Sequence, residues 1–166
     1  MAISIESIDS SQAAVLAAIH NRCFDAPWDA AAFATLLGQP GSFGRIALHG
    51  APVGFVLCRR ALDEMEILTL CVLPEMRGRS VATNLLRSAL EDARGMGVRS
   101  AFLEVAVSNA PALRLYHRAG FAAAGRREAY YRARDGVSVD AVVLSWRCSE
   151  PGCCFDRGGD WGPAGS

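Results

Sequence analysis

The sequence lacks the features that mark a membrane or exported protein. Its longest aliphatic run in the middle of the chain, ILTLCVL at 67–73, is far too short to cross a bilayer. The N-terminal segment MAISIESIDSSQ places no basic residue before an apolar run, so it does not resemble a signal peptide. Seventeen basic residues balance seventeen acidic ones, which leaves no net charge to attract nucleic acid or a membrane surface. We therefore expect a cytoplasmic protein that binds neither nucleic acid nor membrane, and we expect it to be a monomer.

Motifs for nucleotide binding are also missing, and the cysteines give little sign of a metal site. The chain contains neither a G-x-x-x-x-G-K-[ST] loop nor a G-x-G-x-x-G fingerprint. Three cysteines sit singly among apolar neighbours and are interpreted as small buried hydrophobes: Cys23, Cys58 and Cys71. The other three cluster near the C-terminus: Cys148, Cys153 and Cys154. A zinc site there lacks paired ligand spacing and a nearby histidine, so reduced thiols are the better interpretation and no metal is expected.

What the sequence does contain favours one folded domain. The chain has 166 residues, of which 51% are apolar, and this is enough to bury a sizeable core. After Trp146 the periodicity stops and glycine and proline become frequent. We expect residues 1–147 to form the domain and residues 148–166 to form a flexible C-terminal tail.

Hydrophobic periodicity predicts strands and helices in a mixed order. Strands are predicted at 3–8, 44–60 (a hairpin that turns at 49–52), 65–73, 101–107, 121–131 and 137–146. Helices are predicted to begin at Ser10 or Ser11, at Asp29, at Ser80, and at Ser108 or Asn109. This order predicts an α/β fold: one central mixed, largely antiparallel twisted sheet of about six or seven strands with about four flanking helices.

The segment PEMRGRSVATNLL, at 74–86, combines a strand end, a short basic turn and a helix start. A helix N-terminus presents free N–H groups and the positive end of the helix dipole, which suits a phosphate or pyrophosphate. Arg77 and Arg79 add positive charge. An ordinary loop with solvated arginines explains the pattern equally well, so this segment alone does not decide the function.

Together with LEVAVSNAPALRLYHRAGF, at 103–121, this loop resembles the GNAT superfamily of N-acetyltransferases. The turn R-G-R-S-V-A is similar to the acyl-CoA motif Q/R-x-x-G-x-G/A, with Arg77 at its first position and Ala82 at its last. Ser80 is a departure, because the family usually has glycine there. The pattern LEV-x-x-SN-x-x-A-x-x-LY-x-x-x-GF, with FDAPW and RREAYYRARDG elsewhere, is similar to the bacterial RimI subfamily. The resemblance runs from about residue 3 to Trp146.

The resemblance implies a GNAT fold, acetyl-CoA as co-substrate, and direct acetyl transfer without an acyl-enzyme. It implies that Glu104 accepts a proton and that Tyr116 donates one. It assigns cofactor contacts to Leu70, Cys71, Val72, Arg77, Gly78, Arg79, Ser80, Val81, Ala82, Thr83 and Asn109. Tyr130 and Tyr131 match the tyrosine pair that lies beside the peptide groove in this subfamily.

Each assignment has a structural alternative. Glu104 is alternatively a solvated strand carboxylate, Tyr116 a core aromatic, and the tyrosine pair ordinary cross-strand packing. Cys71 is interpreted as a core residue beside the cofactor and not as a nucleophile, since no histidine is recognisably paired with it. The remaining helix arginines are interpreted as solvated, although one is a candidate for the cofactor's 3′-phosphate: Arg87, Arg114 and Arg118.

The function expected from the resemblance is acetylation of the N-terminal alanine of a small-subunit ribosomal protein. One alternative is a GNAT enzyme whose acceptor is a lysine or a small-molecule amine. Another is a non-catalytic acyl-CoA-binding module, which Ser80 favours and the presence of Glu104 and Tyr116 opposes.

Overall fold

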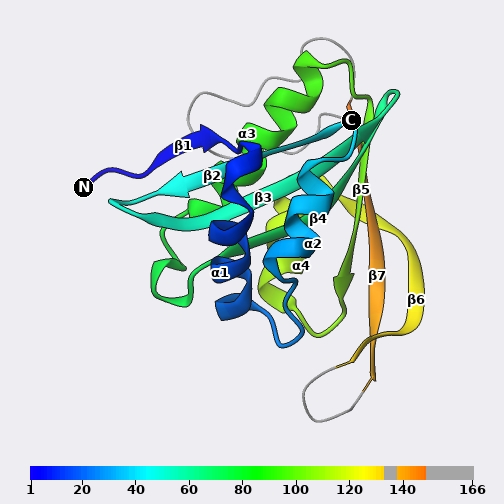
Figure 1. Cartoon of the computed structure of the whole chain (residues 1–166). Coiled ribbons are helices and arrows are strands. Elements are labelled where there is room, and N and C mark those ends of the chain that lie inside the picture. The colour runs from blue at the N-terminus through cyan, green and yellow to red at the C-terminus, as the bar shows by residue number, and fades with distance from the viewer. Residues whose placement is uncertain (133–137, 149–166) are drawn as a thin grey trace.

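Seven strands form one twisted mixed sheet in the order β1-β2-β3-β4-β5-β7-β6 (Figure 1). The computed structural model describes residues 1–132 and 138–148; side chains at 127 and 129–132 lie outside this description. The strands are β1 Ser4–Ser7, β2 Ser42–Leu48, β3 Pro52–Ala61, β4 Glu64–Val72, β5 Ser100–Ala106, β6 Ala122–Arg132 and β7 Ser138–Arg147. Neighbouring strands are antiparallel except β4 and β5, which are parallel. The predicted α/β architecture is confirmed.

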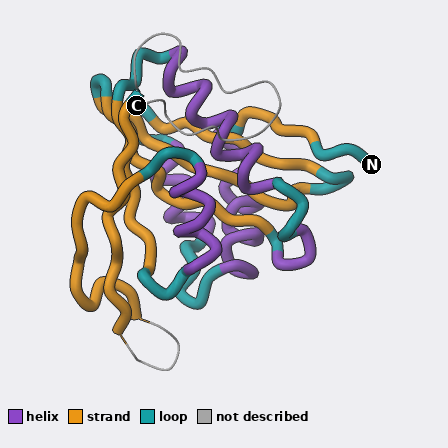
Figure 2. Tube along the Cα trace, turned by 180° about the vertical axis from the view of Figure 1, so that it is seen from behind, coloured by secondary structure: helices purple, strands orange, loops and turns teal. Residues whose placement is uncertain are grey.

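Four α-helices cover both faces of the sheet. Figure 1 shows α1 and α2 on the near face, and Figure 2 shows the helices of the opposite face from behind. The helices are α1 Ala13–Cys23, α2 Ala30–Leu37, α3 Val81–Gly95 and α4 Ala110–Arg118, with short 3-10 turns η1 Ser10–Gln12 and η2 Pro74–Met76. Because α3 buries residues three and four positions apart, one face of it closes the core: Val81, Leu85, Leu86, Ala89, Leu90 and Ala93.

Three of the four predicted helix starts agree with the structure, because Asp29, Ser80 and Asn109 are the N-cap residues of α2, α3 and α4. Asp29 accepts a hydrogen bond from the Ala32 N–H at 2.8 Å, and Asn109 accepts one from the Ala112 N–H at 3.3 Å. The prediction that Ser10 or Ser11 caps the first helical segment was wrong. Asp9 performs this role, because the chain enters α1 through η1 and the Asp9 carboxylate accepts the Ser11 N–H at 2.8 Å.

The parallel pair β4 and β5 is joined only at its beginning. Residues 64–66 of β4 pair with residues 100–102 of β5, and from Ile67 onward that edge of β4 has no strand partner among the described residues. β5 remains paired with β7 along seven positions. The β3–β4 register also shifts opposite Leu68, which marks a β-bulge. Backbone N–H and C=O groups on the open edge of β4 are therefore available to a ligand.

Two further sequence predictions, the flexible tail and the lack of a membrane span, are compared with the described residues only. The predicted tail, 148–166, lies outside the described residues except for Cys148, whose N–H donates to the Arg99 carbonyl at 2.7 Å. Among the described residues, no helix is both long enough and apolar enough to span a membrane.

Candidate active site

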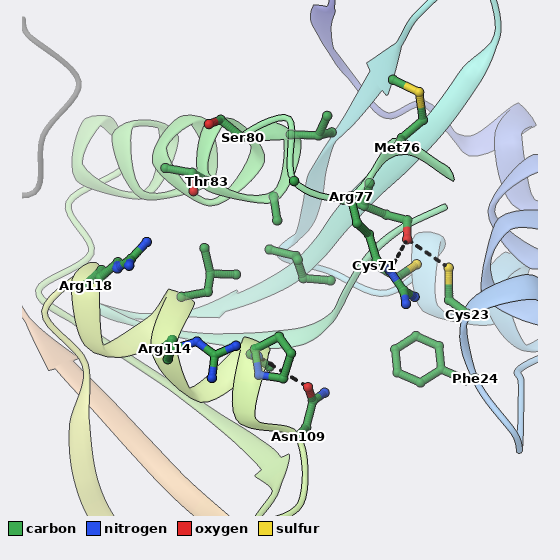
Figure 3. A pocket seen from close by; sticks show the side chains of 18 residues that line it. Cys23, Phe24, Cys71, Met76, Arg77, Ser80, Thr83, Asn109, Arg114 and Arg118 are labelled. Atoms are coloured by element: carbon green, nitrogen blue, oxygen red, sulfur yellow. Dashed lines mark hydrogen bonds between the residues drawn. The ribbon is translucent and has the colours of Figure 1, made fainter. Parts of the chain in front are cut away.

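A cavity of about 630 Å³ lies between the end of β4 and the starts of α3 and α4 (Figure 3). The end of β4 contributes Leu70, Cys71 and Val72, and the end of α1 contributes Cys23 and Phe24. Residues 109–118 of α4 and its cap close the opposite side. The cavity thus sits at the end of β4, beyond the point where β4 and β5 lose their pairing.

All of the predicted cofactor residues except Arg79 line this cavity. Leu70, Cys71 and Val72 line it from β4, and Asn109 lines it from the start of α4. The loop and first turn of α3 contribute Arg77, Gly78, Ser80, Val81, Ala82 and Thr83. Arg79 is exposed and is not among the lining residues. Segments far apart in sequence therefore converge on one space, while the role of each residue in holding a cofactor stays a prediction.

The cavity wall carries positive charge from two directions. The Arg77 Nε–H donates to the Val72 carbonyl at 3.2 Å, which fixes the loop against the end of β4. Arg114 and Arg118 line the cavity from α4, one helical turn apart (Figure 3). Both are exposed, as predicted, and their position at the cavity is compatible with the alternative that one of the helix arginines contacts the cofactor's 3′-phosphate, which stays a prediction. Together with the free N–H groups of α3, this wall suits a multiply charged anion.

Ser80 holds an unusual backbone conformation at the entry to α3. Its φ is +61°, in the left-handed region, and its side chain makes no capping hydrogen bond. A residue with a Cβ is strained there by about 1–2 kcal/mol, whereas glycine is not. The family's usual glycine therefore has a backbone reason at this position.

A second hollow, of about 780 Å³, carries the predicted proton acceptor. We call this hollow the acceptor groove; it is lined by Trp28, Ala32, Thr35, Leu36, Glu66, Ile67, Leu68 and Glu104. Glu104 lies on β5 and is half-buried. Residues 66–68 of β4 line the groove and residues 70–72 line the cavity, so neighbouring stretches of one strand contribute to both spaces. The β4 bulge is at Leu68, which lines the groove.

The structure places the predicted proton donor in a different setting. Tyr116 lies on α4 with 6% of its surface exposed, and its ring meets Phe121 edge-on at a centroid distance of 5.6 Å. It is not among the cavity-lining residues, although its neighbour Leu115 is. This packing is what the core-aromatic alternative expects, so the donor role stays a prediction. Tyr130 and Tyr131 lie on β6, and their side chains are outside the described part of the chain.

A buried histidine positions the loop that borders the acceptor groove. His20 Nδ1 accepts the Trp28 N–H at 3.0 Å, and the two rings stack with centroids 4.9 Å apart. Burial lowers the pKa of His20 to about 4, so the ring is neutral near pH 7 and can accept this hydrogen bond. Sequence reasoning missed His20, because nothing in the surrounding pattern distinguishes it from a surface histidine.

The thiols and carboxylates do not form a metal site in the described structure. Among the described residues, no group of three or more His, Cys, Asp or Glu side chains is arranged to hold a metal ion. Cys58 and Cys71 are buried, as predicted. Cys23 was expected to be buried but is only partly so, because it lies at the cavity wall.

Comparison with known proteins gives a consistent result. The model of the Acetyltransferase (GNAT) family matches residues 13–121. The [ribosomal protein bS18]-alanine N-acetyltransferase of Escherichia coli K12 is 28% identical over 142 residues, covering 86% of this chain and 95% of that protein. The N-alpha-acetyltransferase RimI of Mycobacterium tuberculosis is 36% identical over 132 residues, covering 76% and 80%.

A solved structure is similar over nearly the whole described fold. The crystal structure of the ribosomal-protein-S18-alanine N-acetyltransferase from Escherichia coli superposes with a TM-score of 0.84 at 27% identity. The superposition covers 91% of this chain and 97% of that one.

Proposed function

Because this chain belongs to the Acetyltransferase (GNAT) family and is an acetyltransferase, we propose that it moves an acetyl group from acetyl-CoA to a protein N-terminus. The proposed acceptor is the N-terminal alanine of a small-subunit ribosomal protein. Acetyl-CoA occupies the cavity in this proposal, and the acceptor peptide enters through the acceptor groove.

One observation supports the proposal: neighbouring stretches of β4 line the cavity and the acceptor groove, with Glu104 on the groove side. A direct transfer needs the thioester carbonyl and the attacking amine to meet without an intermediate carrier. The open edge of β4 offers backbone groups that can orient the acetyl end of the donor. The arginines of the cavity wall and the start of α3 suit the phosphates at its other end.

The reaction itself needs two proton movements. The amine attacks the thioester carbonyl and must then lose a proton, which the Glu104 carboxylate accepts in this proposal. The carbon–sulfur bond breaks, and the departing CoA thiolate takes a proton from the Tyr116 hydroxyl. No acyl-enzyme forms, so neither thiol at the cavity wall is needed for transfer.

The choice of an α-amine is supported by ordinary acid–base magnitudes. At pH 7 an N-terminal amine of pKa about 7.7–8.0 is roughly one-tenth neutral, whereas a lysine of pKa about 10.4 is neutral about four times in ten thousand. One glutamate is therefore adequate for an N-terminus and a weak base for lysine. The names of the two relatives support the same acceptor class.

A panel of acceptors tests the proposal. Initial rates are measured with an Ala-starting peptide of ribosomal type, an N-blocked lysine peptide and a simple alkylamine. The enzyme contains no lysine, so acetylated lysine in the assay comes from the acceptor peptide. We expect the Ala-starting peptide to be the preferred acceptor. Preference for lysine or the alkylamine would contradict the acceptor, and binding of acetyl-CoA without any transfer would favour a binding module.

Variants in the same assay test the two roles. Glu104→Gln and Tyr116→Phe keep the shape of each side chain and remove the acid–base group, so we expect rates to fall about 100-fold or more. Glu64→Gln, at the exposed start of β4, is the matched control and should keep the wild-type rate. A near-normal rate in Tyr116→Phe would assign Tyr116 to core packing instead of proton donation.

A further inference from the structure

Two cysteines from distant segments meet at the cavity wall. Cys23 is the last residue of α1, and Cys71 is the penultimate residue of β4. The Cys23 thiol donates to the Val72 carbonyl at 3.5 Å, and Val72 directly follows Cys71 in β4, so both thiols lie at the same point of the cavity wall. Figure 3 shows both side chains beside Arg77, facing the same cavity.

The surroundings give the two thiols unequal acidity. The hydrogen bond from Cys71, with smaller contributions from the positive charges of Arg77 and Arg22, lowers the pKa of Cys23 to about 7 against the effect of burial. The pKa of Cys71 is raised well above the usual range by the same hydrogen bond and by burial. Glu75, the nearby carboxylate, is paired with Arg22 at 2.9 Å. Near neutral pH, Cys23 is therefore the nucleophile and Cys71 holds the proton.

We propose that Cys23 and Cys71 form a site of covalent modification, a thiol pair that a hydroperoxide converts into a disulfide at the wall of the cavity. The pair plays no part in acetyl transfer. Its chemistry follows from the placement of both thiols around Val72 and from their access to the cavity, and it stands whether or not the proposed acceptor is correct.

The steps balance with a hydroperoxide as the two-electron oxidant. The Cys23 thiolate attacks the terminal oxygen of ROOH, which forms Cys23–SOH and releases ROH after protonation. Oxidation removes the hydrogen bond to the Cys23 thiolate and its negative charge, which are two of the causes that raise the pKa of Cys71. The Cys71 thiolate then attacks the Cys23 sulfur and displaces hydroxide, which leaves as water. Overall, two thiols and ROOH give one disulfide, ROH and H₂O.

Oxidation has a predictable effect on the cavity. The disulfide joins the end of α1 to the open edge of β4 beside residues 70–72, which also line the cavity. We therefore expect the oxidised protein to bind acetyl-CoA more weakly than the reduced protein. This consequence rests on the proposed function, whereas disulfide formation does not.

Peptide mapping of the full chain tests the proposal. Reduced protein is treated with one equivalent of H₂O₂ at pH 7, blocked with N-ethylmaleimide and digested with trypsin without reductant. Arginine cleavage places Cys23 in peptide 23–45, Cys58 in 46–59 and Cys71 in 61–77, so each thiol is read separately. Cys58 is an internal control, since it is fully buried and burial raises its pKa.

We expect a cross-link between peptides 23–45 and 61–77 while Cys58 stays a thiol. In Cys71→Ala the cross-link disappears, and alkylation of Cys23 by iodoacetamide at pH 7 slows roughly three-fold, because less of it is thiolate. Disulfides confined to other cysteines, or Cys23 oxidised without ever joining Cys71, would overturn the proposal. Acetyl transfer by the reduced protein is measured in parallel, so failure of either proposal is seen separately.

Discussion

At the scale of single residues, backbone conformation at the cavity entry offers a clear test. Ser80 and Leu62 are the two non-glycine residues with left-handed φ in the described chain, at +61° and +56°. Ser80 lines the cavity, whereas Leu62 is 88% exposed in the turn between β3 and β4. Both positions carry backbone strain, but only Ser80 also places a side chain at the predicted cofactor site.

Ser80→Gly should raise the free energy of unfolding by up to about 1 kcal/mol, since relief of the strained φ exceeds the added freedom of the unfolded chain. It should also lower the KM for acetyl-CoA, because the Cβ leaves the cavity wall. Thermal unfolding and acetyl-transfer kinetics measure the two effects.

Leu62→Gly is the matched control for this variant. It relieves the same kind of strain on the far end of β3, so the unfolding temperature should rise while the KM for acetyl-CoA stays unchanged. A KM that is equal or higher in Ser80→Gly would contradict a role for residue 80 in limiting cofactor binding.

At the scale of elements, the close approach of β2 and β3 supports the sheet beside the site. A Cβ added to Gly44 would lie 2.3 Å from the Val56 carbonyl oxygen, and this backbone atom cannot move aside without breaking the pairing. Gly95, at the end of α3, has no atom within 4 Å of such a Cβ. Substitution of Gly44 therefore tests the steric effect of a Cβ between two strands, and substitution of Gly95 tests helix propensity.

Gly44→Ala should lower the free energy of unfolding by about 1–3 kcal/mol through overpacking. Gly95→Ala should raise it by roughly 0.5–1 kcal/mol, because alanine favours the helix and restricts the unfolded chain. Urea unfolding of both variants measures the difference, and a stable Gly44→Ala would show that β2 and β3 can separate locally.

The elements themselves could be predicted from sequence, but their arrangement could not. Periodicity located α3 and the hairpin of β2 and β3, and Asp29 and Asn109 act as the expected caps, because these are local properties. The placement of β7 between β5 and β6 depends on pairing between distant segments. The same is true of the open edge of β4, where no local pattern indicates that pairing with β5 ends.

The residues of the candidate site also divide into those that a local motif located and those that only the fold brings to the site. The loop of residues 77–83 carries a local motif and was located in advance, whereas Cys23 and Phe24 reach the cavity only because α1 crosses the end of β4. Arg79 shows the opposite case: it belongs to the motif in the sequence, but in the fold it is exposed and does not line the cavity. Resemblance supplied Glu104 and Tyr116, and neither periodicity nor composition distinguishes them from ordinary strand and core residues.

At the scale of the whole molecule, the neutral His20 links global stability to pH. In the unfolded chain its pKa is near the ordinary 6.5, whereas in the folded protein burial lowers the pKa to about 4. Between these values the unfolded state binds more protons, so the free energy of unfolding falls as the pH drops from about 6.5 to about 4. Above pH 6.5 this contribution is fully present, and it is on the order of 3 kcal/mol.

Denaturant unfolding at pH 7, 6, 5 and 4 measures this dependence. In His20→Phe the slope between pH 6.5 and 4 should flatten, because the titrating group is absent. An unchanged slope in that variant would assign the acid sensitivity to other groups and would contradict the structural account of His20.

The central claim for the whole molecule is direct acetylation of a protein N-terminus at the junction of cavity and acceptor groove. The most direct measurement uses one peptide that begins with a free alanine and contains one internal lysine, incubated with acetyl-CoA and analysed by tandem mass spectrometry. The account predicts acetyl on the alanine nitrogen, with this product lost in Glu104→Gln. Acetyl mainly on the lysine, or an undiminished product in Glu104→Gln, would contradict it.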